Sequence, residues 1–172
     1  MTVNGLNRVI LFICITFLLS SCEAFKSINS GSGSGNNTTK VDAMMVKRNN
    51  LAKYGQKYVG TKYKYAGKDP KGFDCSGFTA YVMKSEGITV SPSSKIQATE
   101  GKAVPLNKVK PGDLIFFGKN GKVSHVAMVV SNTYEGISVV HSTTSKGVMV
   151  QNITKSTYWK PKILFARDVI SP

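Results

Sequence analysis

The sequence predicts an α+β domain, and three observations support this. In the first part of the chain, apolar residues recur at helical spacing, whereas in the last part they alternate every second residue, as in half-buried strands. Helices that precede a run of antiparallel strands are typical of an α+β fold. The chain has 172 residues, of which 41% are hydrophobic, and this suffices for the core of one domain with terminal extensions.

A first helix is expected from about Val41, because Leu51, Tyr54 and Tyr58 fall at positions i, i+3 and i+7. Gly60 is a plausible end for this helix, since glycine is common just beyond the last helical turn. A short helix that begins at Ser93 or Ser94 is expected later in the chain.

A second helix is expected from the stretch 71–78, Lys-Gly-Phe-Asp-Cys-Ser-Gly-Phe, to the vicinity of Gly87, with apolar residues at Phe78, Tyr81 and Val82. Asp74 is a good N-cap residue, because its carboxylate can accept the unpaired amides of the first turn. Cys75 would then stand at the positive end of the helix dipole. This position favours the thiolate and would lower a pKa that is ordinarily about 8.5.

Strands are expected after a turn at Pro111-Gly112-Asp113. They cover residues 114–117, 123–130, 137–141, 148–153 and 163–166. Alternation along the second of these strands places on one face Val123, His125, Ala127 and Val129.

Cys75, His125 and His141 are the candidates for a catalytic centre. A thiol nucleophile needs a base that takes its proton, and the base needs a further group that fixes its orientation and tautomer. We expect His125 to be the base and His141 to be the orienting group, on neighbouring antiparallel strands. The backbone amide of Cys75 is a candidate donor to an oxyanion.

The same residues allow other interpretations. Either histidine alone could be an ordinary core or surface residue, Cys75 could be a small buried hydrophobe, and together they could bind zinc. Zinc ligands usually include a closely spaced pair, which this sequence lacks, so no metal site is predicted. No cofactor is predicted either. Trp159 is interpreted as a core residue or the wall of a groove.

Residues 1–21 are predicted to be a lipoprotein signal peptide, because Arg8 precedes a short apolar run that ends at Leu19-Ser20-Ser21-Cys22. This tetrapeptide resembles the lipobox of bacterial lipoproteins, in which the cysteine is lipidated and becomes the new N-terminus. Residues 22–48 are predicted to be the lipidated N-terminus with a flexible linker, and residues 49–172 the folded domain. A signal anchor that is not cleaved is the alternative.

A lipid at Cys22 would anchor an exported protein to a membrane, because several acyl chains bind a bilayer firmly. The expected location is the periplasmic side of an outer membrane. Cys14 would be removed with the signal peptide. Cys75 would then be the free thiol of the mature chain.

The formal net charge of +14 suggests a polyanionic neighbour, such as a membrane surface or an acidic wall polymer. No run of like charges is longer than Lys47-Arg48, which argues against nucleic acid as the partner. The alternative is that the lysines only keep a small domain soluble.

The chain resembles the NlpC family of bacterial cell-wall cysteine peptidases, over about residues 51–166. The matching segments, in the family's order and spacing, are 73–78, 111–117, 124–127 and 140–143. The resemblance implies a papain-like fold with N-terminal helices on a small antiparallel sheet. It places the nucleophile, base and orienting residue at Cys75, His125 and His141.

The resemblance also implies a tyrosine near the oxyanion position at Tyr63, for which Tyr65 is an alternative, and substrate-lining positions at Asp74 and Ser76. The implied activity is that of an endopeptidase, acting through a thioester acyl-enzyme. It would cleave amide bonds of peptidoglycan stem peptides or cross-links, beside D-glutamate or diaminopimelate. The expected partners are these stem peptides and, through the lipid, a membrane, and the chain is expected to be a monomer.

Two other functions stay open at this stage. One is a thiol acyltransferase or lipid hydrolase of related fold, and the other is a non-catalytic wall-binding lipoprotein. The presence of a nucleophile, a base and an orienting group argues against the second.

Overall fold

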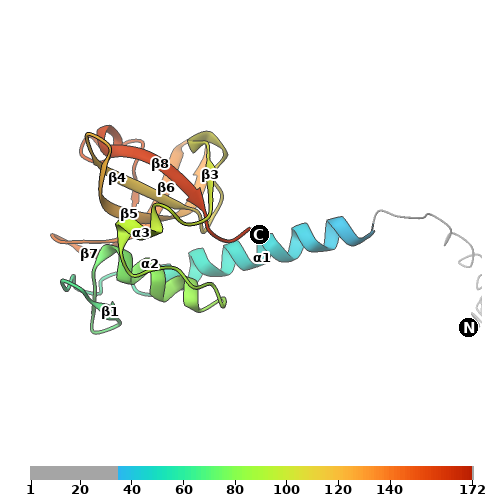
Figure 1. Ribbon diagram of the computed structural model, residues 1–172, viewed down its shortest axis with the longest axis horizontal. Coiled ribbons are helices and arrows are strands. Elements are labelled where there is room, and N and C mark those ends of the chain that lie inside the picture. Colours follow the sequence, from blue (N-terminus) through green and yellow to red (C-terminus); the bar gives the residue numbers. More distant parts are fainter. Residues whose placement is uncertain (1–34, 172) are drawn as a thin grey trace, which may run out of the picture. The chain divides into compact units, whose positions relative to one another are not determined.

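The computed structural model describes residues 35–171, and their architecture confirms the predicted α+β class (Figure 1). Three helices come first: α1 (Gly35–Gln56), α2 (Cys75–Lys84) and α3 (Ser94–Gln97). A small hairpin between α1 and α2 is formed by β1 (Lys68–Asp69) and β2 (Gly72–Phe73).

A six-stranded antiparallel sheet follows, in the order β3-β8-β4-β5-β6-β7. Its strands are β3 (Lys102–Val104), β4 (Leu114–Lys119), β5 (Lys122–Thr133), β6 (Gly136–Thr143), β7 (Gly147–Asn152) and β8 (Ile163–Asp168). Two 3-10 turns, η2 (Leu106–Lys108) and η3 (Lys160–Lys162), precede β4 and β8. Strand β3 was not predicted, because its three mostly exposed residues at a sheet edge show no alternation.

Helix α1 belongs to the domain along more of its length than expected. It begins at Gly35, within the predicted linker, and it ends at Gln56, before Gly60. Arg48 is only 1% exposed, so the predicted boundary between residues 48 and 49 falls inside a packed helix and is wrong. The predicted signal peptide and Cys22 lie outside the described residues. Among residues 35–171, no helix combines the length and the apolar character that crossing a membrane requires.

Arg48 joins α1 to one end of the sheet, where the start of β4 lies beside the end of β8. Its Nη1 lies 2.6 Å from Oδ1 of Asp113, just before β4, and its Nη2 lies 2.6 Å from Oδ2 of Asp168, at the end of β8. Asp113 is also buried, so the pair is removed from water and depends on both partners.

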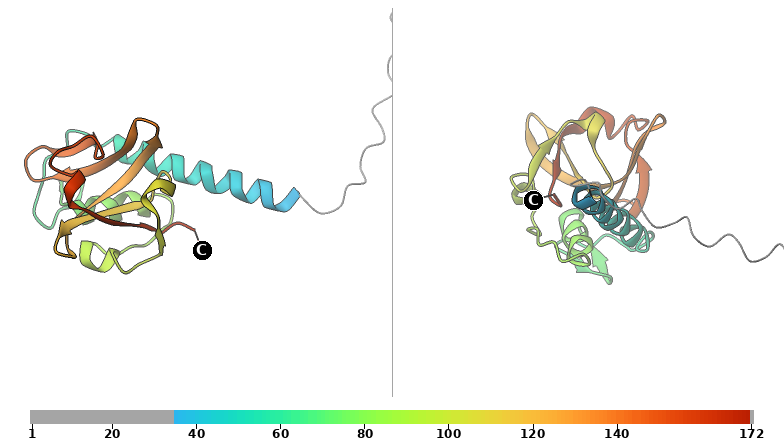
Figure 2. Two further views of the ribbon diagram at one scale, coloured as in Figure 1. Left: turned by 90° about the horizontal axis from the view of Figure 1, so that it is seen from above. Right: turned by 90° about the vertical axis from the view of Figure 1, so that its right-hand side faces the viewer.

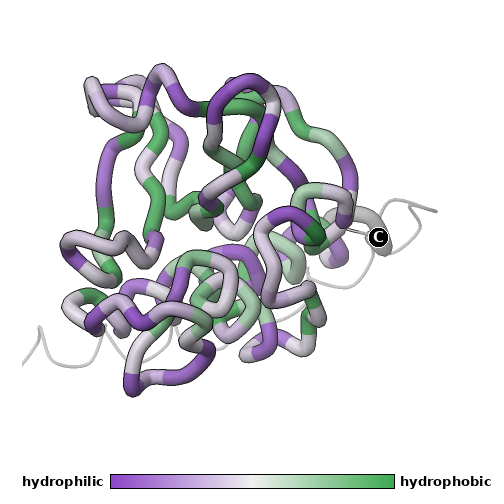
Figure 3. Tube along the Cα trace, turned by 60° about the vertical axis from the view of Figure 1, so that its left-hand side comes forward, coloured by the Kyte–Doolittle hydropathy of each residue, from purple (hydrophilic) through white to green (hydrophobic). Residues whose placement is uncertain are grey.

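Apolar side chains pack in two clusters on opposite faces of the sheet. The first cluster joins the helices to the sheet and includes Leu51, Phe78, Val82, Leu114, Phe116, Val126 and Met128. The second cluster includes Ile115, Phe117, Ala127, Val129 and Val139. Successive residues of β4 and β5 therefore alternate between clusters, as the period of two predicts. Figure 2 shows α1 and α2 together beside the sheet, and Figure 3 shows how hydrophobic and hydrophilic residues are distributed along the chain trace.

Candidate active site

The site begins at the first turn of α2, which the sequence specifies locally. Asp74 is the N-cap, as predicted, and its Oδ1 accepts a hydrogen bond of 2.6 Å from the Gly77 amide. The Asp74 amide in turn donates to the Gly67 carbonyl at 3.0 Å. A Cβ at Gly77 would lie 2.1 Å from that same carbonyl oxygen, so only glycine fits there. Cys75 is thus fixed as the first residue of α2.

The Cys75 thiol is partly buried and forms no disulfide. Burial raises the pKa of this thiol, and so does the charge of Asp74, while the backbone amides of Val126, Ser76 and Cys75 itself lower it. The net shift of the pKa is upward. The amides at the helix end lower the pKa, as expected, but desolvation outweighs them, so the expected net lowering of the Cys75 pKa is wrong. At neutral pH the group is a thiol that needs a base.

A β-bulge in β5 directs His125 toward the same site. Phe117 on β4 lies opposite His125 and the next residue, Gly118, lies opposite Val123, so Ser124 has no partner. Beyond the bulge, Val123 packs in the first cluster with Val126, contrary to the predicted alternation. Both Ser124 and His125 line the pocket as a result.

The two histidines contact each other, from neighbouring antiparallel strands as expected. His125 Nε2 lies 3.0 Å from His141 Nδ1, and His141 is fully buried on β6. Since Nε2 of His125 is engaged, Nδ1 is the nitrogen left for a reacting group. Burial lowers the pKa of His125 to about 3, with a further contribution from the His141 charge, and burial lowers that of His141 to about 4. Both rings are neutral at pH 7.

Trp159 covers the two imidazoles. Its ring stacks on that of His125, with centroids 4.6 Å apart and an interplanar angle of 29°, and lies 5.0 Å from the His141 ring. It also lines the pocket, so its interpretation as the wall of a groove agrees with the structure. Its contact with both imidazoles was missed, because Trp159 comes from an irregular segment before η3 that carries no periodic signal.

Gln151 is another residue that sequence reasoning missed. His141 lies opposite Met149 of β7, and Gln151, two residues further along, lies on the same face of the sheet. Nε2 of His141 is buried and has no hydrogen bond of normal geometry to any described residue. The Gln151 side chain is the polar group that raises the pKa of His141 through hydrogen bonding, against the larger effect of burial.

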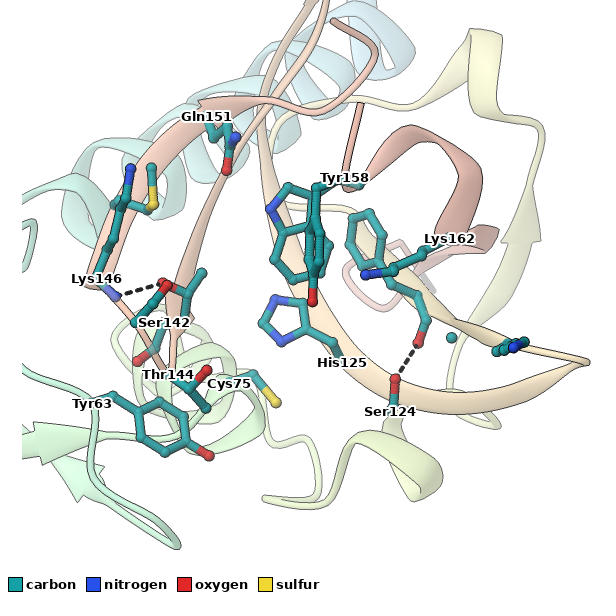
Figure 4. Close-up of a pocket in the computed structure, with 17 residues that line it drawn as sticks. Tyr63, Cys75, Ser124, His125, Ser142, Thr144, Lys146, Gln151, Tyr158 and Lys162 are labelled. Carbon is teal, nitrogen blue, oxygen red and sulfur yellow. Dashed lines mark hydrogen bonds between the residues drawn. The ribbon is translucent and has the colours of Figure 1, made fainter. Parts of the chain in front are cut away.

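Cys75 and His125 line one pocket of about 630 Å³, and Figure 4 shows their side chains next to each other in it. Among the described contacts, no hydrogen bond joins the Cys75 sulfur to an imidazole. The other lining residues are Tyr63, Phe117, Gly118, Lys119, Ser124, Ser142, Thr143, Thr144, Ser145, Lys146, Met149, Gln151, Tyr158, Trp159 and Lys162. Within residues 35–171, no group of three or more His, Cys, Asp or Glu side chains could hold a metal ion.

The remaining predicted residues divide into two groups. Tyr63 lines the pocket, and burial raises the pKa of its hydroxyl, whereas Tyr65 is 87% exposed and does not line it. Asp74 and Ser76 do not line the pocket either. The Ser76 hydroxyl donates to the Pro92 carbonyl at 2.9 Å and contacts Asp74 Oδ1 at 3.2 Å, so both residues support the start of α2. A substrate contact by Asp74 or Ser76 stays a prediction.

Comparison with known proteins extends these observations. Residues 60–168 match the NlpC/P60 family. The chain is 39% identical over 116 residues to a gamma-DL-glutamyl hydrolase of Bacillus subtilis, in a match that covers 64% of this chain but 27% of that protein. It is 28% identical over 175 residues to the Escherichia coli murein DD-endopeptidase MepS/murein LD-carboxypeptidase, covering 92% and 90% of the two chains.

Among solved structures, an NlpC/P60 family protein of Bacillus cereus superposes with a TM-score of 0.66 at 31% identity. This match covers 72% of the present chain and 40% of the other. The chain therefore shares the fold of a domain that, in several relatives, is part of a longer protein.

Proposed function

This chain belongs to the NlpC/P60 family, and on that premise we propose that it is a cell-wall hydrolase that cleaves amide bonds in peptidoglycan peptides. The proposal rests on the observation that Cys75 and His125 line the same pocket. His141 is within hydrogen-bonding distance of Nε2 of His125 and leaves Nδ1 of that ring available. The names of the relatives, a gamma-DL-glutamyl hydrolase and a murein endopeptidase, support amide hydrolysis in cell-wall or glutamyl peptides.

The proposed reaction begins with a neutral thiol and a neutral imidazole. As the Cys75 sulfur attacks the substrate carbonyl, its proton passes to His125 Nδ1, and the carbonyl oxygen becomes an oxyanion. The backbone amide of Cys75, at the start of α2, is the proposed donor to that oxyanion, and the Tyr63 hydroxyl is a second candidate.

The tetrahedral intermediate then collapses to a thioester. The C–N bond breaks, and the leaving amine takes the proton from His125. A water molecule attacks the thioester in the second half of the reaction and gives its proton to the same nitrogen, which returns it to the sulfur. His141 keeps the His125 ring in position through both halves.

The burial of the imidazole pair fits this order of events. Because both histidines have pKa values well below 6.5, the pair accepts a proton only when the reaction delivers one. The imidazolium would then form against the face of the Trp159 ring, which attracts cations.

We also propose that the chain is an exported lipoprotein anchored through Cys22. The support is the Leu19-Ser20-Ser21-Cys22 sequence after a short apolar run. Cells that express Cys22→Ala should release the protein from the membrane fraction. Membrane association equal to that of the wild type would contradict the anchor.

Purified sacculi provide the test of the hydrolase. We expect the full chain to release peptides with new amino termini, which mass spectrometry identifies together with the bond that is cut. The Cys75→Ala and His125→Ala variants should release none. Transfer of acyl groups without hydrolysis would favour an acyltransferase, and binding to sacculi without new termini would favour a wall-binding protein.

A further inference from the structure

Gln97, the last residue of α3, is polar but fully buried, and the proposed reaction does not use it. Its Nε2 donates to the carbonyl of Ser76, at 3.1 Å, and to the carbonyl of Ser91. Its Oε1 accepts the Thr79 hydroxyl at 2.9 Å. Carbonyl oxygens can only accept, so the atom that faces two of them has to be the amide nitrogen. Both ends of this side chain are therefore engaged by specific partners.

These bonds join α3 to the turn of α2 that carries the thiol. Ser76 directly follows Cys75, and Thr79 lies one turn further along the helix. The Ser76 hydroxyl also donates to the Pro92 carbonyl at 2.9 Å. The chain between Pro92 and the end of α3 is thus bonded to the start of α2 at both of its ends.

Helix α3 also contacts β5, the strand that carries His125. The next residue after Gln97 is Ala98, which belongs to the first apolar cluster. So does Val126, the neighbour of His125 on β5. The backbone amide of Val126 interacts with the Cys75 sulfur and lowers its pKa. The element that carries Gln97 therefore touches both the helix of the proposed nucleophile and the strand of the proposed base.

We propose that Gln97 is a positioning residue, whose amide sets how close the Cys75 sulfur lies to the His125 ring. The proposed reaction passes the thiol proton to the imidazole, and this transfer requires the two groups to come within hydrogen-bonding distance. A bond that holds α3 to α2 while α3 packs on β5 limits how far the two groups can separate. The inference rests on the proposed function and adds to it a residue that does not line the pocket.

Gln97→Met keeps the approximate volume of the side chain and removes its amide. The carbonyls of Ser76 and Ser91 then lose a buried donor, so the first turn of α2 can shift relative to β5. Such a displacement should lower kcat about ten- to a hundredfold, as misplacement of reacting groups by a remote substitution does. KM should change less than about twofold, because Gln97 lies outside the pocket and does not meet the bound peptide.

Gln97→Glu is the conservative variant, and its effect should depend on pH. A protonated carboxyl group keeps one donor and one acceptor, whereas a carboxylate would face two carbonyl oxygens. Burial raises the pKa of this carboxyl group above the ordinary value of about 4.3, and so do the neighbouring carboxylates of Glu100 and Asp74. The variant should therefore approach the kcat of the wild type near pH 5 and lose activity toward pH 8, where the wild type stays active.

The test measures kcat and KM of the full chain on stem peptides from sacculi, together with thermal melting by circular dichroism at each pH. Val109→Ala is the control for stability alone, since Val109 is buried in the second cluster, away from α3. It should lower the melting temperature and leave kcat unchanged wherever the chain is folded. An unchanged kcat in folded Gln97→Met, or a loss confined to KM, would overturn the inference and leave the hydrolase intact. If Gln97→Met does not fold, a pH profile of Gln97→Glu equal to that of the wild type would do the same.

Alkylation of Cys75 by iodoacetamide, located by peptide mapping, provides a second measurement that needs no substrate. A neutral thiol reacts faster when a base takes its proton, so Gln97→Met should slow the reaction at pH 7 and Val109→Ala should not. A loosened fold would instead expose the thiol, and faster alkylation of Gln97→Met would show that Gln97 only stabilises the domain. Slower alkylation in a chain that hydrolyses neither peptides nor sacculi would overturn the proposed function and support the positioning role.

Discussion

His125 Nε2 lies 3.0 Å from His141 Nδ1, and this contact determines which nitrogen of His125 can react. If His141 carries its proton on Nε2, its Nδ1 accepts a hydrogen bond from His125 Nε2–H. His125 Nδ1 is then unprotonated and free to take the Cys75 proton. The tautomer of the buried His141 ring therefore determines whether Nδ1 of His125 can accept a proton.

Gln151 is expected to fix that tautomer. A side chain that raises the pKa of His141 through hydrogen bonding accepts a hydrogen bond from it, which favours a proton on Nε2. Gln151→Leu should lower kcat by about tenfold with little change in KM, as removal of an outer-shell partner does at other sites. Gln151→Glu, which can still accept, should keep most of the activity. ¹⁵N NMR of the His141 ring reads the tautomer directly, and an unchanged spectrum in Gln151→Leu would reject this role.

The lowered pKa values of the two histidines predict an unusual pH dependence of kcat/KM. Each pKa is lowered in the folded chain, to about 3 for His125 and about 4 for His141, so the proposed base, His125, becomes protonated only at more acidic pH than usual. The acid limb of kcat/KM should therefore lie below pH 5, without an inflection near 6.5. An acid limb at pH 6 to 7 would contradict the burial of the pair.

Stability should depend on pH through the same groups. Because the folded pKa values lie below the unfolded value of about 6.5, the unfolded chain binds more protons between these limits. The stabilising contribution of the neutral pair is present above pH 6.5 and is lost as the pH falls to about 3, the folded pKa of His125. The melting temperature should decrease by several degrees over this range, and less in His141→Asn.

Trp159 offers an optical probe of the protonation of the imidazole pair, since it is the only tryptophan in the sequence and it stacks on His125. A protonated imidazole in contact with an indole quenches its fluorescence. In the pH range where circular dichroism shows a folded chain, quenching should have its midpoint below pH 5, and it should be weaker in His125→Ala, in which only His141 contacts the indole.

Gly77 is expected to be intolerant of a side chain. The Cβ of alanine would lie 2.1 Å from the Gly67 carbonyl oxygen, which also accepts the Asp74 amide. Gly77→Ala should lower the free energy of unfolding by about 1–3 kcal/mol and displace Cys75, with a loss of activity. Gly87→Ala is the control, because its Cβ meets nothing within 4 Å and the cost is only that of a positive φ. Equal activity of the two variants would contradict the role of Gly77.

Arg48 is expected to hold α1 on the domain. Arg48→Met leaves the buried Asp113 without its cation and should cost about 3–5 kcal/mol in the free energy of unfolding, measured by urea denaturation. Lys53→Met, at an exposed position of the same helix, should cost much less. A similar midpoint for both variants would show that the buried ion pair does not hold the helix.

The sequence predicted the features that depend on neighbours along the chain. The N-cap at Asp74, the start of α2 at Cys75 and the buried strand β4 follow from local patterns, and the match of separate segments predicted the family. The burial of Arg48, the bulge at Ser124 and the raised pKa of Cys75 were not predicted. Each depends on atoms far away in the sequence, such as a carboxylate, a partner strand or the surfaces that exclude water.

The positions of Trp159 and Gln151 beside the imidazole pair also depend on contacts between residues far apart in the sequence. Nothing in the local sequence indicates that an irregular segment and a strand residue meet one imidazole pair. Only the register of β6 with β7 and the path of the chain before η3 bring them there.

Trapping of an acyl group on Cys75 is the most direct test of the account. Intact-protein mass spectrometry of the full chain, quenched in acid during hydrolysis of L-alanyl-γ-D-glutamyl-L-lysine or of stem peptides from sacculi, should show an adduct with the mass of the acyl fragment. Peptide mapping should place this adduct on Cys75, and Cys75→Ala should form none. Continued hydrolysis by Cys75→Ala, or product release without any adduct on the cysteine in single-turnover experiments, would contradict the thioester mechanism.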